Sequence, residues 1–501
     1  MGYGRQYAFH TAVTVATTVL TGALFYVLRI AFYQYLTPEQ YGLFYAAYSF
    51  AMAIQPVLSF GFDPGLVPYI TQFREEKKPE AIRDLALTAL VPQCVFALAL
   101  GLAVAMLAGP ASRALFSDTA GAGLLVILAV HAFLAVLFKS GQQILLAVQS
   151  LVWRNVADLV RAVACLAFGY LFVSRGLGVN GVGWAYTAAA AAAVLLQTLA
   201  IAVSHRSILR GRPQWSWHLT SRAFGSGKYL SLAFGGIVVF SSLDTMFITV
   251  VRGDMREVAA YQIALPTAMI IYSLITAAGL SFMPMARTLW VRNERALLAD
   301  GLGRIYEAAC VLILPAGVLM AAFSDVLITT LFGSDILNAP EAFNLLAVAG
   351  VFYFVSYLNL HVLAGIGQAK AAASIIGVAL AVDLLLDPVL IYFFGIQGAA
   401  GASLIGYCIA SLLGMYAVAW KLPIRWPVKA LFTSAAGSAV LWCACSWVKD
   451  TALFGEWPRL TALGTAFSLF FALVLVLELI GAARMRHLIA MMLPGRRGNG
   501  S

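Results

Sequence analysis

The chain has 501 residues, of which 62% are hydrophobic and 11% charged, and its mean hydropathy is +0.88. A soluble core cannot take up so much apolar side chain, so the composition predicts a protein whose solvent is a lipid bilayer. The net charge of +10 accompanies no basic stripe or aromatic platform, which excludes nucleic acid as an expected partner.

Apolar stretches follow one another along the chain, separated by short polar connections. A transmembrane helix needs roughly 20 apolar residues, and the uncharged runs are Gln6–Leu28, Tyr41–Phe62, Leu85–Ser112, Thr119–Phe138, Gly176–Ser204, Val258–Ala286, Ala308–Ser324, Ala342–Gln368, Pro388–Trp420, Ala430–Val448 and Leu460–Leu477. Three more runs are interrupted by charge, at Val152–Val173, Arg222–Val250 and Ala371–Phe394, and the part of the long late run after Gly395 forms a helix of its own. The sequence predicts an all-α integral membrane protein with about 14 transmembrane helices, because backbone exposed to lipid must satisfy its own hydrogen bonds.

The basic residues predict an orientation. With both termini in the cytoplasm, 23 of the 32 Lys and Arg residues fall on the cytoplasmic side, six on the opposite side, and Arg29, Lys139 and Arg161 within the membrane. Cytoplasmic loops carry such an excess, and basic residues there also contact anionic membrane lipids. The first apolar stretch is too long for a signal-peptide core. We therefore expect a multi-pass protein of the inner (plasma) membrane that keeps its first helix.

The six cysteines lie in apolar segments and show no spacing typical of paired metal ligands. No metal site, disulfide framework or cofactor is therefore expected. We interpret the cysteines as small packing residues.

The chain contains an internal repeat. The segment 178–185 before the sixth predicted helix resembles the segment 395–402 before the twelfth. The segment 61–68 likewise resembles 278–284, at nearly the same separation along the chain. Two copies with an even number of helices are expected to be related by an axis along the membrane normal, with a cavity between them. The predicted domains are an N-terminal six-helix bundle (1–205), a cytoplasmic linker (206–228), a C-terminal six-helix bundle (229–421), helices 13 and 14 (422–482) and a cytoplasmic tail (483–501).

Three motifs carry a resemblance to a known family. They are Tyr35-Leu36-Thr37-Pro38-Glu39-Gln40-Tyr41-Gly42-Leu43-Phe44, the segment Gly61–Pro68, and the Gly178-Val179-Asn180-Gly181 entry to the sixth helix. With the basic first loop, they resemble the polysaccharide (Wzx-type) flippases, of the superfamily that includes multidrug and toxin extrusion transporters and lipid II flippases. The resemblance implies a transporter and no enzyme. It would move a polyprenyl-pyrophosphate-linked oligosaccharide from the inner to the outer leaflet by alternating access, with a polysaccharide polymerase and glycosyltransferases as partners.

Three cations in the first half are candidates for substrate binding. A charge at bilayer depth costs roughly 2.5–3.5 kcal/mol on insertion scales, and Arg29, Lys139 and Arg161 could line one cavity for an anionic pyrophosphate, which guanidinium groups bind bidentately. The alternatives are an ion pair of Arg161 with Asp158, three residues away, snorkelling of Arg29 to the interface, and structural pairing of Lys139.

Three anions in the second half are candidates for ion coupling. Asp383 and Asp387 are four residues apart, on one helical face, and Asp244 lies on the seventh predicted helix. Neighbouring carboxylates in a low dielectric cannot all ionise cheaply, so they are expected to hold a proton or a cation such as sodium. The alternative is a salt bridge to Lys139 or Arg29.

Other functions predict different features. A cation-coupled multidrug exporter would favour an anionic first-half cavity, and a lipid II flippase belongs to the same superfamily. A membrane glycosyl polymerase or ligase would need larger outer loops with acid and base groups. Since no Gly-rich phosphate loop or ATPase motif occurs, energy is expected from a gradient, a partner or the distribution of the lipid.

Overall fold

The computed structural model describes residues 3–59, 62–116, 121–210, 214–215, 217–333, 336, 338–450 and 468. In chain order, its helices are α1 (Tyr3–Tyr35), α2 (Pro38–Leu58), α3 (Phe62–Glu75), α4 (Pro79–Phe116), α5 (Gly121–Ala147), α6 (Leu151–Ser174), α7 (Gly178–Ser204), α8 (Arg206–Leu209), α9 (Trp217–Arg252), α10 (Met255–Val291), α11 (Arg295–Ala322), α12 (Ser324–Phe332), α13 (Ala339–Gly365), α14 (Ala369–Phe394), α15 (Ile396–Lys421) and α16 (Val428–Asp450). Apart from Ser468, the predicted fourteenth membrane helix lies outside the described residues, and so does the predicted tail.

Eleven of these helices are long and apolar enough to cross a membrane: α1, α4 to α7, α9, α11 and α13 to α16. This confirms the prediction of an all-α membrane protein. Two further long helices, α2 with 21 residues and α10 with 37, are not among the eleven. Three tyrosines and two glutamines reduce the hydropathy of α2, which is consistent with a helix that packs against protein on several sides.

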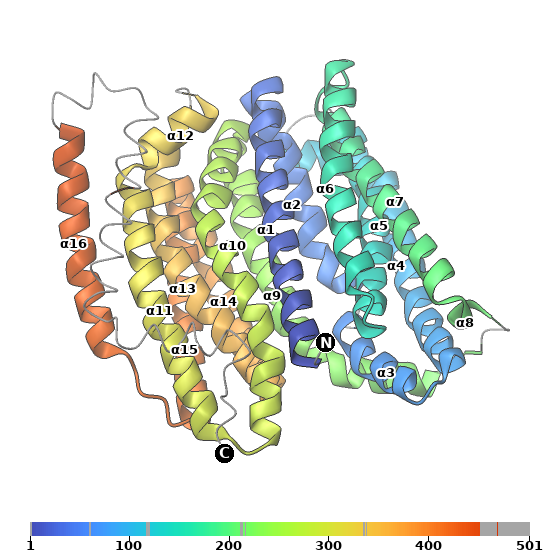
Figure 1. The fold of residues 1–501 in the computed structure, drawn as a ribbon. Helices are drawn as coiled ribbons and strands as arrows, with labels where there is room; N and C mark the ends of the chain where they lie inside the picture. Colours follow the sequence, from blue (N-terminus) through green and yellow to red (C-terminus); the bar gives the residue numbers. More distant parts are fainter. Residues whose placement is uncertain are drawn as a thin grey trace.

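The helices pack in two groups (Figure 1). In the first, α4 packs on α5, α5 on α7, and α6 on both α7 and α1; in the second, α13 packs on α10 and α15, and α14 on α9 and α15. The last described helix, α16, lies against α11 at the far edge of the second group. The groups meet where α2 packs on α9 and α10, α3 on α9, and α1 on α10.

The starts of α2 and α10 are both capped, and they lie at the upper face in Figure 1. Thr37 caps α2 with a side chain that accepts from the backbone N–H of Gln40, whose side chain accepts in return from Thr37, a capping box. Asp254 caps α10 by accepting from the backbone N–H of Arg256 at 2.8 Å. The first turns then face each other, and Arg256 forms an ion pair with Glu39.

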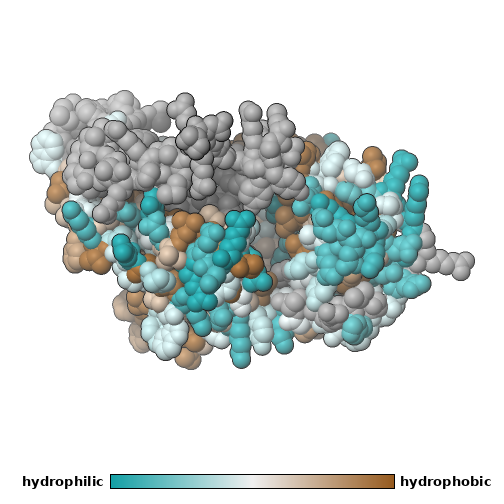
Figure 2. Space-filling model, turned by 60° about the horizontal axis from the view of Figure 1, so that its bottom comes forward, coloured by the Kyte–Doolittle hydropathy of each residue, from teal (hydrophilic) through white to brown (hydrophobic). Residues whose placement is uncertain are grey.

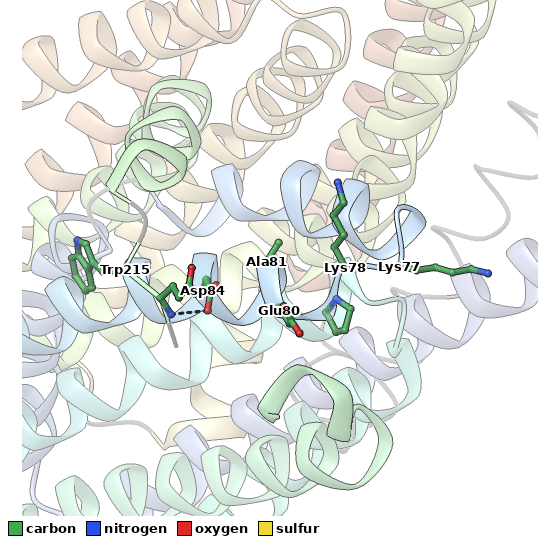
Figure 3. Close-up of a pocket in the computed structure, with 8 residues that line it drawn as sticks. Lys77, Lys78, Glu80, Ala81, Asp84 and Trp215 are labelled. Carbon is green, nitrogen blue, oxygen red and sulfur yellow. Dashed lines mark hydrogen bonds between the residues drawn. The ribbon is translucent and has the colours of Figure 1, made fainter. Parts of the chain in front are cut away.

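The lower face carries many polar side chains, which Figure 2 shows in teal with hydrophobic side chains, in brown, among and around them. Here the segment after α7 is bound to the start of α4: Arg83 donates to the carbonyl oxygen of Arg210, and the backbone N–H of Gln214 donates to Asp84 at 3.0 Å. Next to these bonds lies a surface pocket of about 610 Å³, whose lining includes Lys78 and Trp215 (Figure 3). The segment that joins the two halves is therefore attached to the first of them.

Candidate functional site

Arg29 lies on α1 where the first group of helices meets the second. Its guanidinium stacks over the ring of Tyr45, 4.2 Å from the centroid. Its NH1 nitrogen donates to the side-chain oxygen of Gln262 on α10 at 3.1 Å and to the backbone oxygen of the same residue at 3.2 Å. Arg29 is therefore held between the two halves of the molecule by a cation–π contact and hydrogen bonds.

A cluster of tyrosines surrounds Arg29. The ring centroids of Tyr41 and Tyr45 on α2 are 4.6 Å apart, and Tyr48, one turn further on, lies 5.3 Å from Tyr186 on α7. The hydroxyl groups of Tyr41 and Tyr45 are buried and have no hydrogen-bond partner among the described residues. Buried hydroxyls without a partner are costly. Beside an arginine, they are placed to donate to an anion.

Arg161 lies on the other side of this tyrosine cluster. Its guanidinium carbon is 4.8 Å from the ring centroid of Phe25 and 4.9 Å from that of Phe138, and the ring of Phe25 is 6.2 Å from that of Tyr186. Arg161 also pairs with Asp158 at 3.7 Å. The structural ion pair considered for it is thus formed, and it partly neutralises the charge.

Lys139 approaches α2 from α5. Its Nζ lies 3.4 Å from the side-chain oxygen of Gln55, at the end of α2 remote from Arg29. The structure therefore brings Arg29 and Arg161 to a shared aromatic cluster. Lys139 contacts the same helix, α2, at another level.

The three acidic residues of the second half converge, although Asp244 comes from α9 and the other two from α14. Each of Asp244, Asp383 and Asp387 offers a carboxylate oxygen that lies within 4.8 Å of the others, and all three residues are fully buried. Asp244 accepts hydrogen bonds from the hydroxyls of Tyr261 and of Ser403, the latter at 2.8 Å. We call these three aspartates the acidic cluster.

The acidic cluster lacks charge neutralisation within the described part of the chain. The carboxylate oxygens of Asp383 and Asp387 have no hydrogen-bond partner there, and none of the ion pairs formed there reaches the cluster. The salt bridge between these aspartates and Arg29, which the sequence left open, is not formed, since Arg29 binds Gln262 instead. Three adjacent buried carboxylates cannot all carry a charge cheaply, so this arrangement fits uptake of protons or of a cation.

Sequence reasoning missed the uncharged members of both sites. Gln262, Tyr261 and Ser403 lie in apolar helices, and Tyr41 and Tyr45 read as ordinary aromatic residues of a membrane helix. Gln262 is a polar side chain within a long apolar run, and that was the one signal available for it. Its partners, however, come from distant helices.

Comparison with known proteins places the chain in a family. Residues 9–290 match the family described as polysaccharide biosynthesis protein, which is more than half of the 501 residues. The chain belongs to this family of membrane flippases. Such proteins are transporters rather than enzymes, as the sequence predicted, and this flippase is a multi-pass membrane protein.

Two relatives match long parts of the flippase. It is 23% identical over 408 residues to the uncharacterized membrane protein MJ1068 of Methanocaldococcus jannaschii, covering 78% of this chain and 79% of that protein. It is also 23% identical over 289 residues to the "Probable low-salt glycan biosynthesis flippase Agl15" of Haloferax volcanii, covering 58% of each chain.

Solved structures share the fold. A lipid II flippase MurJ in an inward closed conformation superimposes with a TM-score of 0.73 at 14% identity, over 96% of this chain and 99% of that chain. An inward-facing multidrug resistance transporter of the MATE family gives a TM-score of 0.64 at 15% identity, over 82% and 98%. At such identities the similarity concerns the fold alone.

Proposed function

We propose that this flippase moves a polyprenyl-pyrophosphate-linked oligosaccharide from the inner to the outer leaflet, for surface polysaccharide export. The observation that carries the proposal is the site around Arg29, at the contact between the two halves. There a guanidinium lies beside two buried tyrosine hydroxyls that have no hydrogen-bond partner in the described part of the chain. A pyrophosphate needs several such donors when it leaves water. Arg161 and Lys139 would add positive charge around the same path. The name of the relative Agl15 supports a glycan cargo.

Transport by alternating access is supported by contacts between the halves at two levels. Near the upper face, Glu39 on α2 pairs with Arg256 on α10. Toward the lower face, Pro56 on α2 packs closely on Gly235 of α9. A Cβ atom added to Gly235 would lie 2.7 Å from the Cβ atom of Pro56. We propose that these two contacts separate in turn, which would open the Arg29 site to one leaflet at a time.

The acidic cluster is our candidate for ion coupling. Its carboxylates are buried, adjacent and without a cation partner among the described residues, and uptake of a proton or a sodium ion would relieve their repulsion. Downhill movement of that ion would then supply the energy for transport.

We propose the topology predicted from the sequence: 14 transmembrane helices, in six-helix bundles over 1–205 and 229–421 with two more helices in 422–482, and a linker (206–228) and tail (483–501) in the cytoplasm. The membrane is the cell (inner or plasma) membrane, with both termini on its cytoplasmic side. The excess of Lys and Arg on that side supports this topology.

The test is the loss of surface polysaccharide. Arg29→Ala or Lys139→Ala, at unchanged protein level, is expected to abolish it in the native host. The matched control is Lys370→Ala, which removes an exposed cation at the start of α14 and is expected to leave the polysaccharide intact. Normal polysaccharide in both site variants would contradict the proposal.

Two related activities remain candidates because of the shared fold. A cation-coupled multidrug exporter predicts that deletion changes drug susceptibility, and a lipid II flippase predicts that deletion is lethal. The cationic first half argues against the first, since drug cations favour an anionic cavity. A viable deletion strain that lacks surface polysaccharide and keeps its drug susceptibility would exclude both.

A further inference from the structure

Two hydrogen bonds lie next to each other between α9 and α10. Tyr261 donates its hydroxyl to Asp244, and the following residue, Gln262, donates its side-chain amide to the hydroxyl of Thr245 at 2.6 Å. Both donors are consecutive residues on α10 and both acceptors are consecutive residues on α9. A shift of one helix along the other therefore strains both bonds together.

The second bond continues to Arg29. The side-chain oxygen of Gln262 accepts from the guanidinium at 3.1 Å, while its amide nitrogen is engaged with Thr245. Both ends of the Gln262 side chain are thus hydrogen-bonded. Its oxygen binds Arg29 of the substrate site, and its nitrogen binds Thr245, the neighbour of Asp244. Gln262 is 5% exposed and Thr245 is fully buried. In such surroundings hydrogen bonds in series strengthen one another, and breaking one is costly.

The bonds to Gln262 also limit what Arg29 can offer a ligand. A guanidinium has five N–H donors, of which NH1 carries two, and both hydrogen bonds to Gln262 use NH1. Release of Gln262 would return these donors to the site. The hydrogen bonds to Gln262 therefore limit how many hydrogen bonds Arg29 makes to a pyrophosphate.

We propose that Gln262 is a positioning residue that couples the occupancy of the acidic cluster to the phosphate affinity of Arg29. This rests on the proposed function, since it assumes that the cluster takes up an ion and that Arg29 binds lipid pyrophosphate. Uptake of a cation or proton neutralises the carboxylate that Tyr261 binds, which weakens that bond and changes the contact of α9 with α10. Gln262 moves with its neighbour Tyr261, and the hydrogen bonds from Arg29 to Gln262 break or form again. By linkage, lipid pyrophosphate changes the ion affinity by the same factor.

The experiment measures the affinity of the full-length protein in lipid nanodiscs for undecaprenyl pyrophosphate. Titrations are made in sodium chloride and in choline chloride, each at pH 8 and pH 5.5. For the wild type, we expect the dissociation constant to change about five-fold or more between ion conditions, as is typical of coupled sites. In Thr245→Val and in Gln262→Met the lipid still binds, but the ratio between conditions falls to about one.

A matched control comes from the same helix. Thr249, one turn after Thr245, is also buried, but its hydroxyl donates to the backbone oxygen of Thr245 within α9. Thr249→Val therefore removes a comparable hydroxyl without touching α10, and it is expected to keep the wild-type ratio. Gln262→Glu gives a further readout. An ionised glutamate forms an ion pair with Arg29 and cannot donate a hydrogen bond to Thr245. The affinity for the lipid is therefore expected to fall in every condition.

The outcomes separate the two proposals. If Thr245→Val and Gln262→Met keep the wild-type ratio, the coupling role of Gln262 is wrong and the proposed function stands. If the wild type does not bind undecaprenyl pyrophosphate, the proposed function itself fails. If it binds the lipid equally in all conditions, ion coupling through the acidic cluster and the role of Gln262 both fail.

Discussion

A Cβ atom added to Gly42 on α2 would lie 1.8 Å from the backbone carbonyl oxygen of Met255 on α10. Backbone this close allows no side chain at all. Gly42 lies in the segment Tyr35–Phe44, one of those on which the resemblance to the polysaccharide flippases rests. In this segment Glu39 pairs with Arg256, and Tyr41 lies in the cluster around Arg29. One short motif thus contributes to both the upper contact of the two halves and the candidate substrate site.

Gly42→Ala is expected to separate α2 from α10 at the upper face. Overpacking of this kind typically costs about 1–3 kcal/mol, so the midpoint of thermal unfolding should fall and transport should decrease. Gly22→Ala on α1 is the control, because an added Cβ there would meet no atom of another described segment within 4 Å and alanine favours a helix over glycine. Equal thermal stability of the two variants would contradict the tight contact.

Tyr41→Phe and Tyr45→Phe are expected to leave stability unchanged or slightly raised, because neither hydroxyl has a hydrogen-bond partner among the described residues. Their affinity for undecaprenyl pyrophosphate should nevertheless fall about ten-fold, since a hydrogen bond to a charged group contributes roughly 1.5–3 kcal/mol. Tyr35→Phe, at an exposed tyrosine, should change neither property. A loss of stability without a loss of affinity would show that the two hydroxyls are structural.

Asp383→Asn and Asp244→Asn are expected to differ in stability. Asp383 accepts no hydrogen bond from the described residues, so its neutralisation relieves repulsion and should raise the unfolding temperature. Asp244 accepts from Tyr261 and Ser403, so its replacement weakens two bonds and should lower it. Both variants should lose the ion dependence of lipid binding. Equal stability changes would indicate that the two carboxylates have equivalent surroundings.

His205 predicts a pH dependence at the lower face. This residue follows α7, and its ring lies 2.7 Å from the hydroxyl of Ser150. Partial burial lowers the pKa of His205, and the charge of Arg74 lowers it further. The unfolded chain, with a histidine pKa of about 6.5, therefore binds the proton more readily than the folded protein, and stability is lost as pH falls below that value. Between pH 7.5 and 5.5, the thermal stability of His205→Gln should fall less than that of the wild type. Parallel curves for the two proteins would refute this role.

Hydropathy and helical spacing alone predicted an all-α membrane protein, because burial in lipid imposes a minimum length and an internally bonded backbone on every span. They also singled out Arg29, Lys139, Arg161, Asp244, Asp383 and Asp387, since a charge within an apolar run is rare and costly. The spacing of four further predicted that Asp383 and Asp387 share a face, and both turn out buried within one cluster.

The partners of these charges were decided by the tertiary structure. Arg29 and Gln262 are 233 residues apart in the chain, and no local pattern relates them. Asp244 joins Asp383 only because α9 packs against α14. Tyrosine and glutamine carry no charge that would mark them in a hydropathy profile, so their roles depend on which helix faces which. The sequence determined where the charges lie along the helices, and packing determined what each charge meets.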